Sequence, residues 1–302
     1  MQVSVAYFAV LLIWSTTPLG IIWSSESINP TMAVLLRMLI AIVLGALIIY
    51  IKKIPLPWHK QALRLYSYSA LGIFGGMLFS YLAASYLSSG LMSLIFGLAP
   101  VLSTIFSQKI LAEPQITAIK KLAMLLSFIG LAIVSSDNFT FADDAVYGLI
   151  FIFIAVSLFS LSGVLVKSIS LAIHPMATTI GALTIATPLF FICWLLSDGS
   201  VDISQWQAKS IWATLYLGFF GSLIGFVAYF YVLQRLTAST VALITLVTPV
   251  IALTLGALLN DEDLNSKILL GAALVLSGLA LYHWGEVLIN KKLTKMSLAK
   301  EK

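Results

Sequence analysis

The chain has 302 residues, of which 60% are hydrophobic and 10% are charged, with a formal net charge of +5. A soluble domain is about 25% charged, so this composition excludes an ordinary water-soluble globular protein. The apolar residues fall in runs of about 20, the length that an α-helix needs to cross a hydrocarbon core. Runs such as LLSFIGLAIVSS and GLIFIFIAVSLF are apolar on every face, which excludes the alternating pattern of a membrane β-barrel.

Ten such runs predict an all-α integral membrane protein with ten transmembrane helices. In chain order they span residues 5–24, 31–51, 66–86, 90–110, 118–136, 146–168, 174–197, 209–232, 238–259 and 268–288. The first run has no basic stretch before it and no small-residue cleavage site after it, so we expect a retained helix. The single cysteine, Cys193, lies inside an apolar run and forms no internal disulfide.

The basic residues predict which side of the membrane each connection faces. If the N-terminus is cytoplasmic, most Lys and Arg residues fall in cytoplasmic connections, as the positive-inside rule requires. These residues are Lys52, Lys53, Lys60, Arg64, Lys109, Lys120, Lys121, Lys167, Arg235 and the lysines of the tail. Because they lie in short loops rather than on one folded face, they indicate topology and no nucleic-acid partner. We therefore expect a multi-pass protein of the cytoplasmic (inner) membrane with both termini in the cytoplasm.

Short motifs recur in the same order in the two halves of the chain. Residues 28–30 (INP) match residues 173–175 (IHP), and LGIFG at 71–75 matches LGFFG at 217–221. Pro100-Val101 recurs as Pro249-Val250, and Glu113 recurs as Glu262. Their order and nearly constant offset indicate a duplication.

The duplication predicts an inverted repeat. Each half holds five helices, an odd number, so the second half must enter the membrane from the opposite side, as in many secondary transporters. We predict a first repeat over 1–140, a second repeat over 141–288, and a basic cytoplasmic tail over 289–302. A central cavity is expected at their interface.

Several motifs together resemble the EamA family of the drug/metabolite transporter superfamily over nearly the whole chain. They are Trp14-Ser15 followed by Pro18, the segment INPTMAVLLRMLIA with Arg37, the helices of Pro100 and Pro249 that precede Glu113 and Glu262, and the last helices with IGLAI and SGLAL. The resemblance implies ten helices around a central cavity and a family range that includes exporters of amino acids and related metabolites. The phosphate-sugar branch is less similar, because its basic cavity residues have no counterpart here.

Arg37 is the one charge well inside a predicted span, six residues past its start and about 9 Å deep. A charge at that depth is costly and marks a functional site by default. The alternative is a structural role, in which the side chain snorkels to the surface or pairs with backbone carbonyls.

Pro18, Pro100, Gly163 and Pro249 predict helix breaks at corresponding places in the two halves, where transporters bind their solutes. Near these breaks lie aromatic and hydroxyl side chains suited to a mostly apolar cavity that orients a small polar solute. The predicted cavity residues are Trp14, Thr17, Ser80, Tyr81, Phe96, Phe159, Ser160, Tyr229, Thr245 and Thr248. Each of them could instead serve helix packing.

Glu113 and Glu262 precede the last helix of each half, at opposite membrane faces. They are expected to stabilise the positive end of the helix that follows; a gate or a coupling-ion site is the alternative. No phosphate-binding loop that ends in Gly-Lys-Ser or Gly-Lys-Thr occurs. We expect no catalytic residue, metal or cofactor.

These patterns favour a secondary transporter that exports amino acids or related compounds by alternating access. A membrane enzyme that acts on lipid-linked substrates, a transporter of sugars or nucleotide-like metabolites, and a non-transporting scaffold or receptor are the alternatives. The expected partners are a small solute and the lipid bilayer, and the sequence leaves a monomer and a homodimer equally open.

Overall fold

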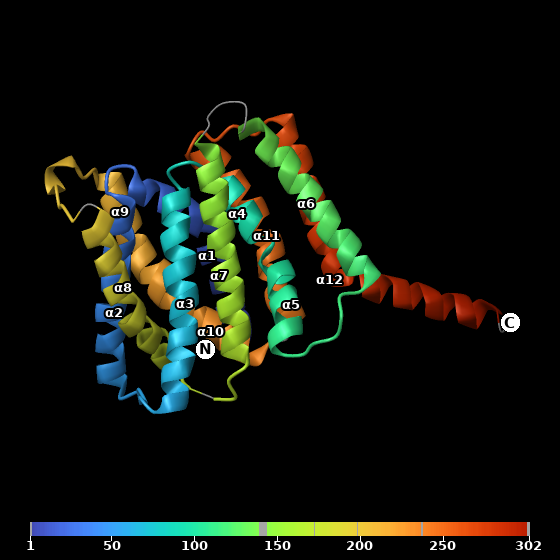
Figure 1. The fold of residues 1–302 in the computed structure, drawn as a ribbon, viewed down its shortest axis with the longest axis horizontal. Coiled ribbons are helices and arrows are strands. Elements are labelled where there is room, and N and C mark those ends of the chain that lie inside the picture. The colour runs from blue at the N-terminus through green and yellow to red at the C-terminus, as the bar shows by residue number, and fades with distance from the viewer. Residues whose placement is uncertain (1, 139–143, 172, 198, 237, 301–302) are drawn as a thin grey trace.

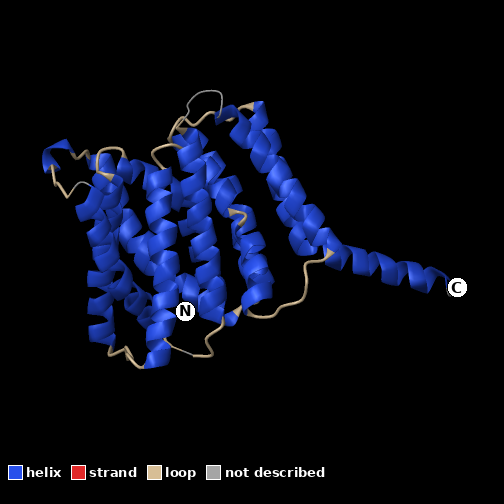
Figure 2. Cartoon of the chain, in the orientation of Figure 1, coloured by secondary structure: helices blue, strands red, loops and turns tan. Residues whose placement is uncertain are grey.

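The computed structural model describes residues 2–138, 144–171, 173–197, 199–236 and 238–300; the side chains of 135–138, 238–243, 245, 246 and 286–300 are outside the description. Throughout these ranges the regular structure is helical, and no strand occurs (Figure 2). Seven stretches are long and apolar enough to cross a membrane, and Val247–Leu259 is a shorter apolar helix. The chain is therefore a multi-pass helical membrane protein.

Each predicted span overlaps a helix or a group of consecutive helices (Figure 1). The elements are α1 (Val3–Ser25), α2 (Pro30–Lys52), α3 (Lys60–Ala83), α4 (Ser89–Phe96), α5 (Ala99–Ile110), α6 (Ala118–Asn138), α7 (Ala145–Lys167), α8 (Pro175–Ser197), η1 (Ile203–Gln205), α9 (Ala208–Tyr216), η2 (Leu217–Ile224), α10 (Gly225–Arg235), α11 (Ala238–Leu259) and α12 (Ser266–Lys300). α12 continues through most of the segment expected as a tail.

Local capping explains where several helices begin. The side chain of Asn29 accepts a hydrogen bond from the amide of Thr31, with Pro30 in the first turn of α2, a combination typical of helix starts. The hydroxyl of Ser88 accepts from the amide of Leu91 at the start of α4. These caps start α2 and α4 directly after short connections, which leave no room for a soluble domain between the helices.

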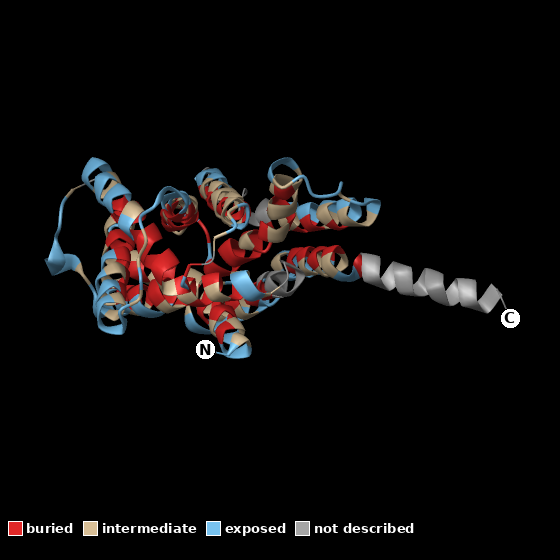
Figure 3. Cartoon of the chain, turned by 90° about the horizontal axis from the view of Figure 1, so that it is seen from below, coloured by how far each residue is buried: buried red, intermediate tan, exposed pale blue. Residues whose placement is uncertain are grey.

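The helices of the two halves interleave. α1 packs against α10 and α11 of the second half, and α7, the first helix of the second half, packs against α3 and α5 of the first. Buried residues line the inward faces of the bundle (Figure 3). Many large apolar side chains on the outward faces are exposed, as at Trp212 and Leu258, which is the surface that lipid requires.

α6 and α12 form a closely packed pair at one edge of the bundle (Figure 1). A Cβ atom on Gly130 would lie 2.6 Å from the carbonyl oxygen of Gly271. In the sequence, Gly278 matches Gly130, and Ala123 matches Gly271. A Cβ atom on Gly278 would lie 2.7 Å from the carbonyl oxygen of Ala123. Small residues thus bring the two backbones together, and the contacts are reciprocal.

Two loops also share one backbone shape. Ala112 and Asp261 have positive φ angles of 52° and 48°. The following residues, Glu113 and Glu262, donate their backbone N–H groups to the carbonyls of Ser107 and Gly256, respectively. The backbone therefore folds alike around Glu113 and Glu262.

Candidate functional site

A cavity of about 730 Å³, its mouth included, lies in the bundle with walls from both halves. Most of its wall is apolar, with a few hydroxyl groups and one guanidinium. The wall residues are Trp14, Thr17, Pro18, Ile21, Arg37, Met77, Ser80, Met92, Ser93, Phe96, Ala99, Phe159, Gly221, Phe226 and Thr248. A concave, mostly apolar site with a few placed polar groups is typical of small-molecule binding.

Most of the predicted cavity residues lie in this wall. These are Trp14, Thr17, Ser80, Phe96, Phe159 and Thr248, together with Pro18 and Arg37. The side chain of Thr245 lies outside the described residues.

Three predicted residues lie elsewhere. Tyr81 is buried and accepts a hydrogen bond of 3.3 Å from the hydroxyl of Ser24. Ser160 is buried and donates to the carbonyl of Ala99 at 3.1 Å, so it joins α7 to α5 behind the wall. Tyr229 lines a second cavity.

The second cavity is narrow and adjoins the first, since Phe159 and Phe226 belong to both walls. Trp14, Phe159 and Tyr229 are in mutual ring contact, with centroids 5.0 to 5.6 Å apart. We call these three residues the aromatic cluster. Ring pairs at these separations favour each other beyond simple burial, and members of the cluster line both cavities.

The prediction of four helix breaks is wrong at three positions. α1, α7 and α11 run without interruption through Pro18, Gly163 and Pro249. A proline removes one backbone hydrogen bond, and in a membrane bundle neighbouring helices hold the helix together despite that loss. Only Pro100 lies at an interruption, between α4 and α5.

An irregularity that the sequence did not predict lies opposite Arg37. Residues Leu217–Ile224 form a π-helical segment, η2, between α9 and α10. Such segments are frequent at functional sites. A Cβ atom on Gly221 would lie only 3.0 Å from Nη2 of Arg37, so this position leaves room for the guanidinium.

Arg37 is fully buried, so it does not snorkel to the surface. Its Nε donates to the hydroxyl of Ser222 at 2.6 Å. Among the described residues, Nη1 has no hydrogen-bond partner. The helices that line the cavity contain no Asp or Glu in their sequences, so the guanidinium has no counter-ion from them.

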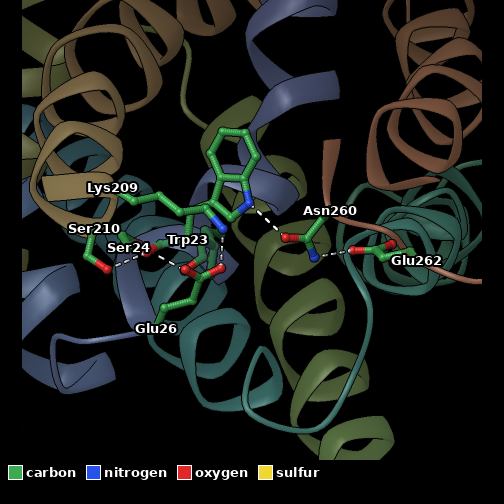
Figure 4. A network of polar contacts seen from close by, with 8 residues as sticks. Trp23, Ser24, Glu26, Lys209, Ser210, Asn260 and Glu262 are labelled. Atoms are coloured by element: carbon green, nitrogen blue, oxygen red, sulfur yellow. Dashed lines mark hydrogen bonds and ion pairs between the residues drawn. The ribbon is translucent and has the colours of Figure 1, made fainter. Parts of the chain in front are cut away.

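A polar network joins the ends of α1, α4, α9 and α11 at the face predicted to be external (Figure 4). Trp23 donates to Asn260 at 2.8 Å, and Asn260 donates to Glu262 at 3.3 Å. Lys209 forms an ion pair of 2.6 Å with Glu26. These bonds tie α1 to the second half on two sides.

Glu262 accepts hydrogen bonds from the amides of Ser89 and Gly90, at 2.9 and 3.1 Å. These amides belong to the first turn of α4, where a carboxylate is stabilised by free N–H groups and the helix dipole. The carboxylate was expected at the start of α12, the helix that follows it, but its hydrogen bonds come instead from the start of α4 and from Asn260.

A family model described as the EamA-like transporter family matches residues 3–136 and again residues 146–284. The chain belongs to the EamA-like transporter family. A protein of Archaeoglobus fulgidus named "Uncharacterized transporter" is 28% identical over 270 residues, which cover 88% of this chain and 93% of the relative. A solved crystal structure with 19% sequence identity has the same fold, with a TM-score of 0.67 over 93% of this chain and 96% of the other.

A shorter match concerns a protein of Escherichia coli K12 named "Probable amino-acid metabolite efflux pump". It is 32% identical over 100 residues, which are 32% of this chain and 33% of that protein. The EamA-like relatives are thus named as transporters, and the cavity lies within the matched region.

Proposed function

We propose that this chain is a secondary carrier that exports an amino acid or a related small metabolite by alternating access, without catalysing a reaction. The observation that carries the proposal is the mid-bundle cavity with walls from both halves, the place where secondary transporters bind their solutes. The partial likeness to a protein named as an amino-acid metabolite efflux pump supports the solute class and the direction.

In this proposal residues 1–140 and 141–288 are inverted repeats that rock against each other. Three observations support it: the family model matches twice in tandem, Gly130 and Gly278 make reciprocal contacts in the α6–α12 pair, and the loops at Glu113 and Glu262 share one shape. The distribution of Lys and Arg supports cytoplasmic termini in a cytoplasmic membrane.

In alternating access, the protein would break a contact at one membrane face and form the equivalent contact at the other face. Here Glu262 holds the start of α4 at one face. The equivalent contact, between Glu113 and the start of α11, would form at the opposite face in the other state. The aromatic cluster is the barrier that a solute must pass between the two cavities.

Transport is tested with the purified chain in liposomes, by counterflow of radiolabelled amino acids, sugars and nucleosides. We expect counterflow of at least one amino acid above protein-free liposomes. Saturable transport of a sugar or nucleoside alone would overturn the solute class, and no counterflow with any compound by folded protein would overturn the carrier.

Variants of the cavity aromatics provide a second test. Replacing Trp14 or Phe96 with Ala should lower counterflow at least tenfold with little change in the amount of folded protein, because both side chains lie in the cavity wall. Phe8→Ala is the matched control, since Phe8 is 61% exposed on the outside of α1. Equal loss of folded protein in all three variants would assign these residues to packing.

Topology is tested by labelling single cysteines in a Cys193→Ser background. Cysteines at position 140 and at Leu56 should react with a membrane-impermeant maleimide from opposite sides. Labelling from one side would refute the proposed orientation of the halves.

A further inference from the structure

We propose that Arg37 is the anion subsite of the cavity and that the transported solute carries one carboxylate, which bonds to its guanidinium. The inference rests on the proposed function, because it names the chemical class of the solute that the same cavity takes. It selects a zwitterion or a monocarboxylate over neutral and cationic compounds.

The first step is the free-energy cost of burying the charge of Arg37 in this structure. A buried charge is stable only when it is paired or fully hydrogen-bonded. Arg37 is 0% exposed, its Nε donates to the neutral hydroxyl of Ser222, and Nη1 bonds to no described residue. With no Asp or Glu in the cavity-lining helices, the missing partner has to arrive with the solute.

The second step is the fit of a carboxylate. A guanidinium presents planar N–H donors that match two carboxylate oxygens. Ser222 holds Nε and so fixes the plane of the group, while Gly221 leaves space beside Nη2. Arg37 is the only charged side chain among the described residues of the cavity wall, which suits one negative charge better than a phosphate dianion.

The third step concerns the other polar groups of the wall. Thr17 and Ser80 donate their hydroxyl protons to the carbonyls of Ile13 and Gly76 in their own helices, at 2.7 and 2.6 Å. Their remaining lone pairs can accept hydrogen bonds. Pro18 has no N–H for the carbonyl of Trp14, one turn earlier. These oxygens suit an ammonium group.

The apolar part of the wall completes the assignment. Met77, Met92 and Phe96 provide flexible thioethers and an aromatic face, which adapt to side chains of different shape. A carboxylate at Arg37, an ammonium at the oxygens near Pro18 and an apolar side chain against these residues together describe an apolar α-amino acid.

The test compares solutes that differ in one charge. L-leucine, L-phenylalanine and L-methionine, the amide of each, and 4-methylpentanoate are titrated against the full chain in detergent micelles, with the thermal unfolding midpoint as the readout. At least one amino acid should bind tenfold or more tightly than its amide. Arg37→Gln should abolish this preference, Arg37→Lys should keep part of it, and Arg235→Gln, which removes an exposed Arg, should leave it unchanged.

Failure of the subsite and failure of the carrier give different results. An amide that binds as well as its acid, or a preference that survives in Arg37→Gln, overturns the subsite even where counterflow is present. Carboxylate binding that depends on Arg37, with no counterflow for any compound, keeps the subsite and overturns the carrier. If Arg37→Gln does not fold, the comparison of acid with amide in the wild-type chain decides whether the cavity has a carboxylate subsite.

One variant separates this role from a structural one. Because Arg37 has no counter-ion here, Arg37→Met should unfold at the same or a higher temperature than the wild-type chain when no solute is present. A clear fall in the unfolding temperature of Arg37→Met, with acid and amide bound equally by the wild-type chain, would make Arg37 a structural residue.

Discussion

The loops 107–113 and 256–262 have the same backbone shape but use their glutamates differently. Ala112 and Asp261 both adopt left-handed backbone conformations, and the residue after each closes the same backbone hydrogen bond. Glu262 accepts bonds from two amides of α4 and from Asn260. Glu113 is exposed, and no hydrogen bond to its carboxylate occurs from the described residues.

The difference shows that the role of each glutamate is set by the helix of the other half that lies beside it. The partner of Glu262 is 173 residues away in sequence, so no local pattern could decide whether this contact forms. One such contact is made in this structure, at one face, and the equivalent loop at the other face is available to make it. The carrier proposed above predicts such an asymmetry, because each of its two states would make only one of the two contacts.

The largest expected effect comes from removing the carboxylate of Glu262. Glu262→Ala loses two hydrogen bonds from backbone amides to a charged group, each of which contributes about 1.5 to 3 kcal/mol, so the free energy of unfolding should fall by at least about 1.5 kcal/mol. Glu113→Ala should change it by less than about 0.5 kcal/mol, as exposed substitutions do. Denaturant unfolding in micelles measures both, and equal losses would refute the difference between the loops.

Much of the fold is predictable from the sequence because it follows from hydropathy. Runs of about 20 apolar residues located every span, and the charges in the loops assigned sides to them. The interruption between α4 and α5 was predicted from Pro100. The π-helical segment at Leu217–Ile224 was not predictable, since it leaves the hydropathy of the span unchanged.

The cavity was predictable only where a residue is unusual for its position. Arg37 stands out as a charge within an apolar run, and Trp14 as an aromatic beside a polar break. Met77, Met92 and Phe226 were missed, because an apolar side chain looks the same in sequence whether it faces lipid, a neighbouring helix or a cavity. Tyr81 and Ser160 were predicted to face the cavity but bond to neighbouring helices, because the face that a side chain presents depends on which helices pack against it.

A smaller effect is expected at Asn260, which links Trp23 to Glu262. Asn260→Ala should lower the free energy of unfolding by about 1 kcal/mol, the net contribution of a typical buried hydrogen bond. Trp23→Phe removes the same indole bond from the other side. In a double-mutant cycle the two losses should therefore be less than additive; full additivity would show that this bond contributes nothing to the stability of the polar network.

The smallest effect tests whether the loops share their strained backbone. A non-glycine residue with a φ near 50° is strained, and glycine adopts that conformation without a steric cost. Ala112→Gly should therefore raise the free energy of unfolding by up to about 1 kcal/mol, since glycine relieves the strain but gains freedom in the unfolded chain. Asp261→Gly should gain less, because Asp tolerates the left-handed region better than Ala does. Since both substitutions lie outside the cavity wall, neither should change counterflow. A loss of stability in Ala112→Gly would mean that its backbone differs from that of Asp261, and the two loops would no longer be equivalent.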